Sequence, residues 1–351
     1  MSTTFSFWTR VLSLVLVLLS VRSVYTSPSP SLEKRASRTS APSGAIVVRP
    51  SNPGSGEFTS VQAAVNSLPN DSSSRSIFIF SGTYNEQVTI TRSGPLTIYG
   101  YTTDTSSYTS NTVTITQSKS AGQSGSDPTS ATLIVNKANF QLYNVNLKNT
   151  FGQSSSNGQA LAVSANGSKQ GYYGVGFYSW QDTVLAETGV QFFGSCYIQG
   201  AVDFIFGQHA FAFFHKNTIA SIGAGCITAD GPTNSTDSIF VINASNIILG
   251  PNATSTTSGN VYLGRPWTSF ARVVVSNSNL GSHINPAGWS IWSTSTPNTA
   301  NVLFGEVGNT GAGASGTRAS FSTKLPSTSG YTISSILGSD YTTWVDTAYS
   351  T

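Results

Sequence analysis

The chain has 351 residues, of which only 9% are charged and 38% are hydrophobic. Its net charge of +3 comes from 17 basic and 14 acidic residues, and the segment up to Arg35 holds four of the basic and one of the acidic ones. The rest of the chain is therefore near neutral, which excludes nucleic-acid binding through a basic surface. A low charge with much Ser, Thr, Asn and Gly is typical of a secreted β protein.

The N-terminal residues have the pattern of a secretory leader. Residues 11–19 are almost all apolar and follow Arg10, but they are too few to cross a bilayer, which takes about 20 residues. We therefore predict a signal peptide over residues 1–26. A Ser- and Pro-rich stretch then ends in Lys34-Arg35, so we expect a propeptide over residues 27–35 that is cut after Arg35, with a solvated linker as the alternative. Residues 36–351 would form a secreted catalytic domain with no membrane attachment.

Beyond the leader, one short helix precedes a long series of strands. Val61, Ala64, Val65 and Leu68 recur at the spacing of a single helix face, and Pro69 ends the helix. Almost everything after it consists of short β-branched or aromatic runs separated by Gly, Ser, Asn and Asp. The first predicted strands are residues 77–80, 88–90, 96–99, 113–116, 132–135 and 140–147.

A repeat of 21 residues organises the central part of the chain. It is visible in the series Leu147, Phe177, Ile198, Ile219, Leu249 and Leu280, whose sequence numbers differ in turn by 30, 21, 21, 30 and 31. A base coil with insertions is typical of a solenoid, in which extra residues loop out on one face. A β-sandwich and a propeller are the alternatives, but Asn-Gly hairpin turns between the runs are scarce. We predict an all-β fold, a right-handed single-stranded parallel β-helix with a short N-terminal capping helix.

Five glycosylation sequons and two cysteines fit passage through the secretory pathway. The sequence numbers of Cys196 and Cys226 differ by 30, so the two do not stack directly at the interval of 21, and both a disulfide and two buried free thiols stay open. Sequons are frequent by chance in this composition, so we expect only some to be used. They begin at Asn70, Asn166, Asn234, Asn243 and Asn252.

Two aspartates are separated by one repeat. Asp182, in Gln181-Asp182-Thr183, precedes Asp203, in Asp203-Phe204-Ile205-Phe206-Gly207, by the same interval of 21. Residues one repeat apart lie above one another in a solenoid, on strands about 4.8 Å apart. Carboxyl groups this close cannot both ionise freely, so one is pushed towards the protonated form while the other stays anionic. We expect an acid and a nucleophile or base at one place.

Further polar residues belong to the same coils. Gln159 lies about one repeat before Gln181, and two amide donors beside two carboxyl groups suit ester cleavage, although either glutamine alone would more often form a side-chain ladder. Arg265 would hold Asp203 ionised and pair with an acidic sugar if it lies near, and would otherwise be a surface arginine. Trp267 offers a flat face to a sugar ring, or packs in the core.

At this point the chain resembles a known family, the pectin methylesterases or pectinesterases of carbohydrate esterase family 8. The resemblance extends from about Phe58 to Trp344 and depends on the order and spacing of several motifs. These are Gly82-Thr83-Tyr84-Asn85-Glu86, Gln159-Ala160-Leu161-Ala162, Gln181-Asp182-Thr183, Asp203-Phe204-Ile205-Phe206-Gly207, Leu263-Gly264-Arg265-Pro266-Trp267 and residues 306–314.

The resemblance implies a role for each matching residue. Asp203 is expected to be the nucleophile, Asp182 the acid and base, and Arg265 the partner of Asp203. The oxyanion donors would be Gln159 and Gln181, and the sugar contacts Phe206 and Trp267. Two positions depart from the family: Val184-Leu185 stands where an aromatic is often found, and Asn217 where many relatives have a second cysteine that bridges to Cys196.

Rival sites have less support. No Gly-x-Ser-x-Gly motif is present, and His209, His215 and His283 lack the spacing of metal ligands. The resemblance implies an esterase that releases methanol from methylated homogalacturonan (pectin). We expect it to need no cofactor or metal and to act as a monomer. The alternatives are another β-helix pectinase, of polygalacturonase or pectate lyase type, and a non-catalytic β-helix that binds polysaccharide.

Overall fold

A computed structural model describes Met1 and residues 37–351. The predicted propeptide, residues 27–35, and all of the predicted signal peptide except Met1 lie outside the described residues, so both stay predictions. Among the described residues, no helix combines the length and the apolar character that crossing a membrane requires.

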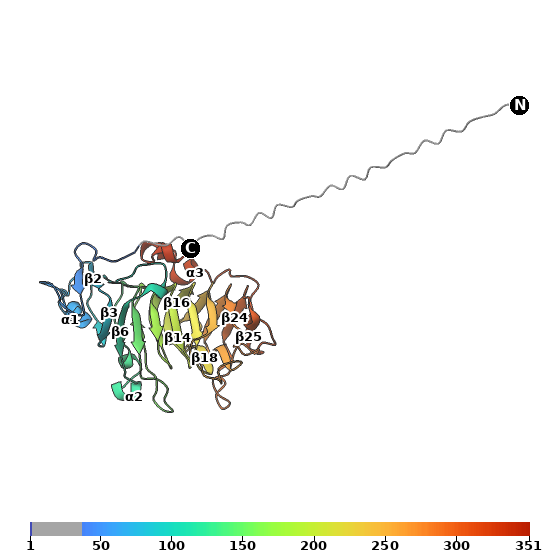
Figure 1. The fold of residues 1–351 in the computed structure, drawn as a ribbon. Coiled ribbons are helices and arrows are strands. Elements are labelled where there is room, and N and C mark those ends of the chain that lie inside the picture. Colours follow the sequence, from blue (N-terminus) through green and yellow to red (C-terminus); the bar gives the residue numbers. More distant parts are fainter. Residues whose placement is uncertain (2–36) are drawn as a thin grey trace. The chain divides into compact units, whose positions relative to one another are not determined.

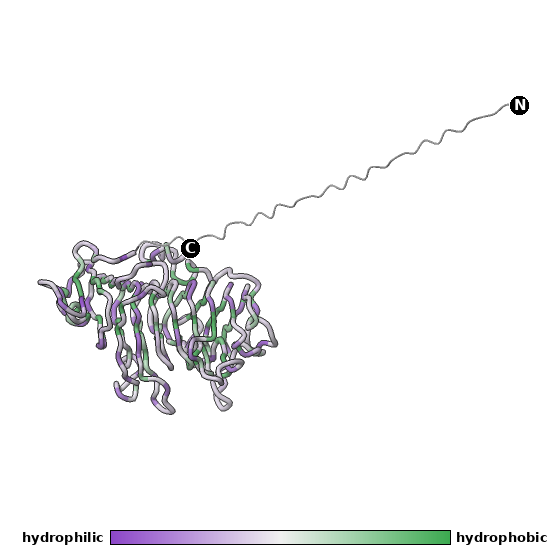
Figure 2. Tube along the Cα trace, viewed as in Figure 1, coloured by the Kyte–Doolittle hydropathy of each residue, from purple (hydrophilic) through white to green (hydrophobic). Residues whose placement is uncertain are grey.

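The strands are stacked in successive coils that run from α1 (Val61–Asn66) at one end to β25 (Ser322–Lys324) at the other (Figure 1). The strand pairs are parallel, and each coil contributes up to three strands, so the stack has three faces. This is the predicted right-handed parallel β-helix. In Figure 2 the hydrophobic segments lie along the stacked strands, while the protruding loops are mostly neutral or hydrophilic.

The first face carries the short strands that matter most for function. It consists of β4 (Val88–Ile90), β7 (Leu133–Val135), β10 (Val163–Asn166), the first part of β13 (Val184–Gly194), β15 (Ile205–Gly207), β18 (Gly225–Asp230) and β21 (Val261–Gly264). Strand β13 continues without a break into the second face, which joins these two faces into one hydrogen-bonded sheet.

The other two faces complete the coils. The second face consists of β1 (Ile46–Val48), β2 (Arg75–Ile79), β5 (Leu96–Gly100), β8 (Phe140–Tyr143), β11 (Gln170–Tyr173), the second part of β13, β16 (His209–His215), β19 (Ile239–Asn243), β22 (Arg272–Ser276), β24 (Leu303–Val307) and β25. The third consists of β3 (Gly82–Asn85), β6 (Val113–Gln117), β9 (Asn146–Asn149), β12 (Gly176–Tyr178), β14 (Tyr197–Gly200), β17 (Thr218–Ser221), β20 (Asn246–Leu249) and β23 (Asn279–Leu280).

The register of the third face tests the predicted repeat. Phe177 pairs with Ile198, and Ile198 with Ile219, so the predicted interval is confirmed for these coils. The next partner of Ile219 is Ile247, not the predicted Leu249, which pairs with Ser221 and is 48% exposed. Residues two apart share a face in an ideal strand, so apolar character alone could not separate Ile247 from Leu249.

The predicted strand over residues 140–147 is wrong as a single element. The structure divides it into β8 and β9 at Asn144, whose φ is 52°. Asparagine tolerates this left-handed conformation better than most residues, which lets the chain turn the corner from the second face to the third. The other predicted strands are confirmed to within one or two residues at each end.

Helix α1 caps the N-terminal end of the stack, as predicted. Its apolar face is buried, and the side chain of Ser60 accepts a hydrogen bond from the backbone N–H of Ala63. The Glu86 carboxylate accepts from the N–H groups of Val61 and Gln62 and from the Ser60 hydroxyl, at 2.7–2.9 Å. A negative charge at a helix N-terminus is stabilising, so the Gly82–Glu86 motif has a structural role here.

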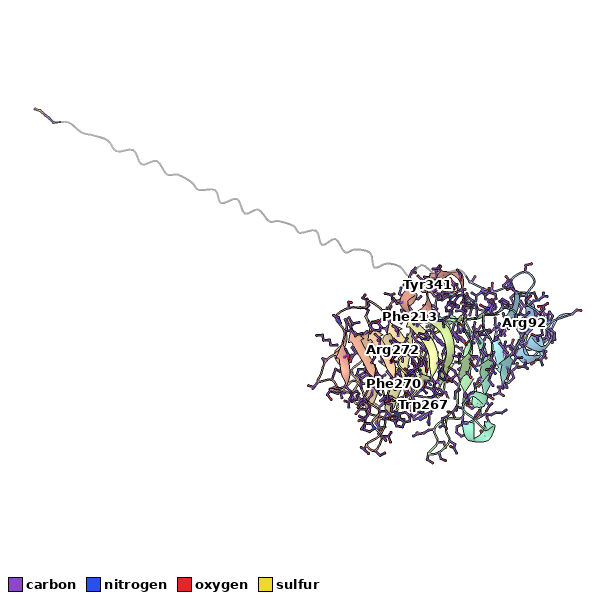
Figure 3. The ribbon with its side chains drawn as sticks, turned by 180° about the vertical axis from the view of Figure 1, so that it is seen from behind. Arg92, Phe213, Trp267, Phe270, Arg272 and Tyr341 are labelled. Carbon is purple, nitrogen blue, oxygen red and sulfur yellow. The ribbon has the colours of Figure 1, made fainter. Side chains whose placement is uncertain are left out.

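Three apolar clusters contain most of the buried apolar side chains of the described residues. The largest fills the inside of the coils. A second lies outside the second face, where Phe213 and neighbouring residues are covered by α3 (Ile333–Leu337) and by Tyr341 of η4 (Tyr341–Thr343); Figure 3 shows the two side chains on the same side of the stack. The third lies outside the first face, around Phe206 and Ala229. The remaining short helices are α2 (Ala121–Ser124), η1 (Tyr108–Ser110), η2 (Pro128–Ser130), η3 (Ala312–Ala314) and η5 (Thr347–Tyr349).

Candidate active site

A cavity of about 250 Å³ opens on the outside of the first face, over the third apolar cluster. All seven side chains that the sequence analysis selected line it together. They come from successive coils: Gln159, Gln181, Asp182, Asp203, Phe206, Arg265 and Trp267, joined by Asp127, Ala229 and Trp292. The seven predicted residues, which lie far apart along the chain, are therefore gathered by the stacking of the coils.

The two aspartates occupy the same position on neighbouring coils. Asp182 is two residues before β13 and Asp203 two residues before β15, and Gln181 pairs with Val202 in parallel register. Both aspartates have a left-handed backbone, with φ of 61° and 48°. This conformation costs energy in any residue but glycine, and aspartate is among the residues that tolerate it. The turn directs both side chains into the cavity, where they are 7% and 6% exposed.

Arg265 holds Asp203 at two points. Its Nη2 donates to Oδ2 at 2.7 Å, and its Nε donates to Oδ1 at 3.0 Å. The guanidinium carbon lies 4.2 Å from the centre of the Trp292 ring, and Nη1 donates to the Trp292 carbonyl at 3.4 Å. Two-point pairing fixes the direction of the carboxylate as well as its charge.

The backbone of strand β18 positions the segment that carries Arg265. The Thr228 carbonyl accepts a hydrogen bond from the Arg265 N–H at 3.0 Å, and the Asp230 carbonyl accepts one from the Trp267 N–H at 3.1 Å. A Cβ on Gly231 would lie 2.6 Å from the Trp267 ring, so the absence of a side chain there lets the indole approach the backbone. Arg265 and Trp267 are thus placed by β18, one coil away.

The two carboxyl groups are electrostatically unequal. Burial raises the pKa of Asp182 well above its ordinary value, with further increases from Asp203 and Asp127 that Arg265 and Gln181 only partly offset. Burial also raises the pKa of Asp203, although the hydrogen bonds from Arg265 oppose that rise. The expected order, with Asp182 as the raised member of the pair, is therefore present. The ion pair alone would lower the pKa of Asp203. Its pKa is raised instead, because the effect of burial is larger than that of Arg265.

Gln181 lies beside Asp182 on the same coil, and Gln159 lies on the coil before it. Both line the cavity, and the Ala160 N–H donates to the Gln181 carbonyl at 3.1 Å, which fixes the two coils against each other. The Oε1 atom of Gln159 is buried and has no hydrogen-bond partner among the described residues. An amide in a side-chain ladder would have its oxygen bonded to a neighbouring amide, so the Gln159 oxygen takes part in no such ladder among the described residues.

The aromatic wall contains one residue that the sequence analysis missed. Phe206 and Trp267 have ring centres 6.3 Å apart, as neighbours around the cavity. Trp292 lines the same cavity and stacks on Arg265. It belongs to an irregular segment that follows Trp289, which pairs with Gly264, and no periodic pattern pointed to it. Its tryptophan identity was the one available signal.

Asp127 was also missed. It lies in the loop between α2 and η2, in a Ser-Gly-Ser-Asp-Pro sequence that reads as an ordinary turn. Its carboxyl group is half-buried and lines the cavity together with Asp182 and Asp203. Burial raises its pKa above the ordinary value for an aspartate.

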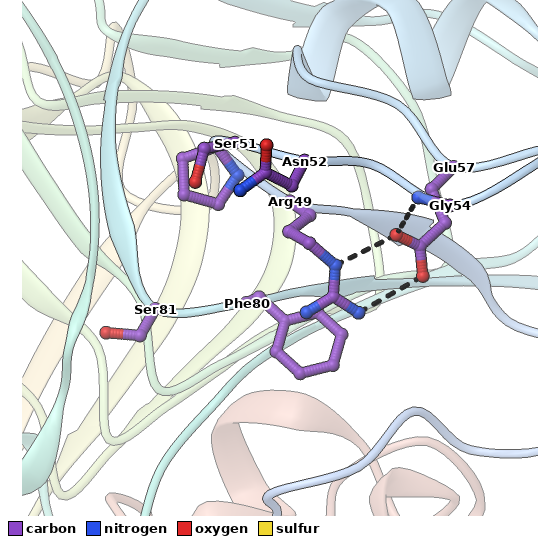
Figure 4. A pocket seen from close by; sticks show the side chains of 8 residues that line it. Arg49, Ser51, Asn52, Gly54, Glu57, Phe80 and Ser81 are labelled. Atoms are coloured by element: carbon purple, nitrogen blue, oxygen red, sulfur yellow. Dashed lines mark hydrogen bonds and ion pairs between the residues drawn. The ribbon is translucent and has the colours of Figure 1, made fainter.

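A larger surface depression at the N-terminal end offers no comparable chemistry. Arg49 donates to Glu57 at 2.9 and 3.2 Å and covers the Phe80 ring at 3.7 Å (Figure 4). The two charges satisfy each other, and the other lining residues are small or neutral. Within the described part of the chain, no group of three or more His, Cys, Asp and Glu side chains is arranged to hold a metal ion.

The two cysteines are free thiols and both are buried, which decides between the alternatives left open by their spacing. Asn217, at the position where many relatives were expected to have a cysteine, instead accepts a hydrogen bond from the Cys196 N–H at 2.7 Å and donates to the Phe193 carbonyl at 3.0 Å. The corner of the coil is thus held by amide hydrogen bonds in place of a disulfide.

Paired carboxyl groups, two amides and a fixed arginine in an open pocket of a β-helix fit the chemistry of a carboxylic ester hydrolase. The comparisons specify the family. The Pectinesterase family model matches residues 45–333. A pectinesterase from Aspergillus niger is 47% identical over 319 residues, which cover 90% of this chain and 94% of the relative, and one from Aspergillus aculeatus is 48% identical over 90% of this chain and 95% of its own.

Solved structures agree. The crystal structure of the deglycosylated pectin methylesterase from Aspergillus niger superposes with a TM-score of 0.81 at 38% identity, covering 89% of this chain and all of the other. The chain belongs to the pectinesterase family. Its substrate is accordingly methyl-esterified pectin, and its reaction is de-esterification.

Proposed function

We propose that this pectinesterase cleaves the C6 methyl ester of galacturonate units through a covalent intermediate on Asp203. The Asp203 carboxylate attacks the ester carbonyl carbon, and the N–H groups of Gln159 and Gln181 stabilise the negative charge that forms on the carbonyl oxygen. The bond to the methoxy group then breaks. The proton on Asp182 passes to the departing oxygen, which leaves as methanol, and Asp203 is left joined to the sugar as an acyl anhydride.

Water completes the cycle. Asp182, now ionised, takes a proton from the water molecule that attacks the acyl carbon, so Asp182 is again protonated. The bond to Asp203 breaks, which frees its carboxylate and leaves a galacturonic acid group in the pocket. This group loses its proton to solvent and becomes galacturonate. Arg265 keeps the Asp203 carboxylate directed at the pocket in both halves of the reaction, and Phe206 and Trp267 provide flat surfaces against which the sugar rings pack.

The observation that carries this proposal is the asymmetry of the pair. Asp203 has a cation at 2.7 Å, whereas no ion pair reaches Asp182 among the described residues. Two carboxyl groups with such different surroundings divide naturally into an anionic nucleophile and a protonated acid. A glycosidase could also use two carboxyl groups, but it has no need for two amide donors beside them.

One incubation tests the reaction against its alternatives. Highly methylated pectin is treated with the purified protein while methanol and chain length are followed together. We expect methanol release at constant chain length. Falling chain length would indicate a backbone-cleaving β-helix pectinase, and neither change would indicate a binding protein, so either outcome would contradict the proposal.

We also propose that the protein is secreted and acts as a monomer. The support is the leader pattern at residues 1–35 and the near-neutral balance of the rest of the chain. N-terminal sequencing of the protein recovered from culture medium should begin at residue 36 if cleavage follows Arg35. Light scattering of the same sample should give the mass of one chain.

A further inference from the structure

The third carboxyl group of the pocket, Asp127, has no place in the reaction described above. Its side chain makes no hydrogen bond and no ion pair with any described residue, since the bonds that reach Asp127 end on its backbone carbonyl, from the N–H and hydroxyl of Ser130. Arg265, the cation of the pocket, is engaged by Asp203. Asp127 is thus a half-buried carboxyl group without a partner among the described residues.

The loop that carries Asp127 is firmly attached to the coils. Gln87 donates to the carbonyls of Thr129 and Ala131 at 2.8 and 2.7 Å, and the Ser130 carbonyl accepts from Gln117 at 2.6 Å and from Asn149 at 2.9 Å. These bonds fix the backbone on the C-terminal side of Asp127 without using its side chain. The carboxylate therefore stays at the pocket through the structure of its surroundings, and replacing it with an amide breaks no bond that holds the loop.

The charges in the pocket do not cancel. Arg265 balances Asp203, and Asp182 is held towards its protonated form, so an ionised Asp127 leaves the pocket with a net negative charge. A methyl ester is neutral and is not repelled by this charge. The product of the reaction is a carboxylate at the same place, and like charges in a partly buried pocket repel each other.

We propose that Asp127 is a specificity-determining residue whose unpaired carboxylate makes the pocket accept the neutral methyl ester and expel the galacturonate carboxylate formed there. The proposal rests on the proposed function, because it is the esterase reaction that converts a neutral group into an anion within the pocket. Discrimination of this kind depends on a repulsive element directed against the wrong ligand. It also predicts that galacturonate units already de-esterified are excluded from the reactive position.

The test measures inhibition of methanol release by fully de-esterified oligogalacturonate. In Asp127→Asn we expect the inhibition constant to fall about tenfold at low ionic strength, while KM for highly methylated pectin changes by less than about twofold. Because the repulsion is electrostatic, the difference from wild type should narrow in about 0.5 M salt. Asp127→Glu, which restores the charge, should be inhibited as wild type is.

Asp340→Asn provides a matched control for the loss of one negative charge. Asp340 pairs with Lys169 at 2.9 Å and is more than half exposed, on the segment that covers the second face and not the first. Its removal should leave inhibition unchanged. The proposal is overturned if Asp127→Asn is inhibited as wild type is, if Asp127→Glu behaves like the amide, or if Asp340→Asn reproduces the effect. Wild type that released no methanol would refute the proposed function instead, which separates the two failures.

Discussion

The ion pairs Asp203–Arg265 and Glu306–Arg318 share a two-point geometry but have different surroundings. Glu306 accepts from Arg318 at 2.8 and 2.9 Å and also from the Trp289 indole at 3.0 Å. Arg318 donates further to the carbonyls of Gly313, Pro286 and Ser315. Asp203, by contrast, accepts only from Arg265 among the described residues.

The difference separates a structural pair from a reactive one. Both oxygens of Glu306 are engaged, so this pair fastens the turn that ends the stack, and the motif at residues 306–314 has a structural role in this chain. The Asp203 carboxylate keeps acceptor capacity that faces a cavity. The Asp203–Arg265 pair therefore contributes less to stability than its short distances suggest. The free lone pairs of the Asp203 carboxylate are available to react.

Replacing Asp203 tests the reactive pair and should have the largest effect. We expect Asp203→Asn to lower methanol release roughly a thousandfold or more, because the amide keeps the shape and removes the attacking charge. Thermal unfolding should show that the variant is folded. A purified variant that retained more than about a tenth of wild-type turnover would remove Asp203 from the role of nucleophile.

Replacing either glutamine tests the proposed oxyanion donors. We expect Gln159→Ala and Gln181→Ala each to lower kcat about a hundredfold or more, since one oxyanion donor contributes roughly 2.7–4 kcal/mol. KM should change little, because the negative charge on the carbonyl oxygen develops only in the transition state. Steady-state kinetics that showed a raised KM with unchanged kcat would assign these amides to ground-state binding.

The substitution Glu306→Gln tests the structural ion pair, as Asp203→Asn tests the reactive one. Removing one charge of a buried pair costs about 3–5 kcal/mol when the pair is fully buried, and we expect roughly 2–3 kcal/mol here because both side chains are partly exposed. The thermal midpoint should fall by several degrees while kcat of the folded protein stays near wild type. Loss of activity without loss of stability would mean that the two pairs do not differ in the way described.

The residues of the pocket differ in how far the sequence predicts their position. The pair of Asp182 and Asp203 was predictable because both aspartates belong to the repeat, so a spacing of one repeat translates directly into stacking. Asp127 and Trp292 lie on irregular segments between strands, where the spacing along the chain carries no information about the distance in space. Leu249 was misplaced for a related reason, since two apolar residues on one strand fit the repeat equally well.

The smallest effect concerns the stability of Asp182→Asn. A carboxyl group whose pKa is raised in the folded protein costs no stability below its pKa in the unfolded chain, which is about 4. The cost grows as the pH rises towards the pKa of the folded protein. Both Asp182 and Asp203 have raised pKa values, so for both the cost appears on raising the pH, and it is larger for Asp182.

An amide at position 182 removes that cost and the repulsion of Asp203. We therefore expect Asp182→Asn to be inactive yet at least as stable as wild type at neutral pH, with the two thermal midpoints converging as the pH falls to about 4. The Asp340→Asn variant shows what loss of a charge does elsewhere: its carboxyl has a lowered pKa through Lys169, so its contribution disappears on acidification instead. A midpoint for Asp182→Asn clearly below that of wild type at neutral pH would contradict the picture of a strained carboxyl pair, because the aspartate would then be stabilising the fold it is expected to strain.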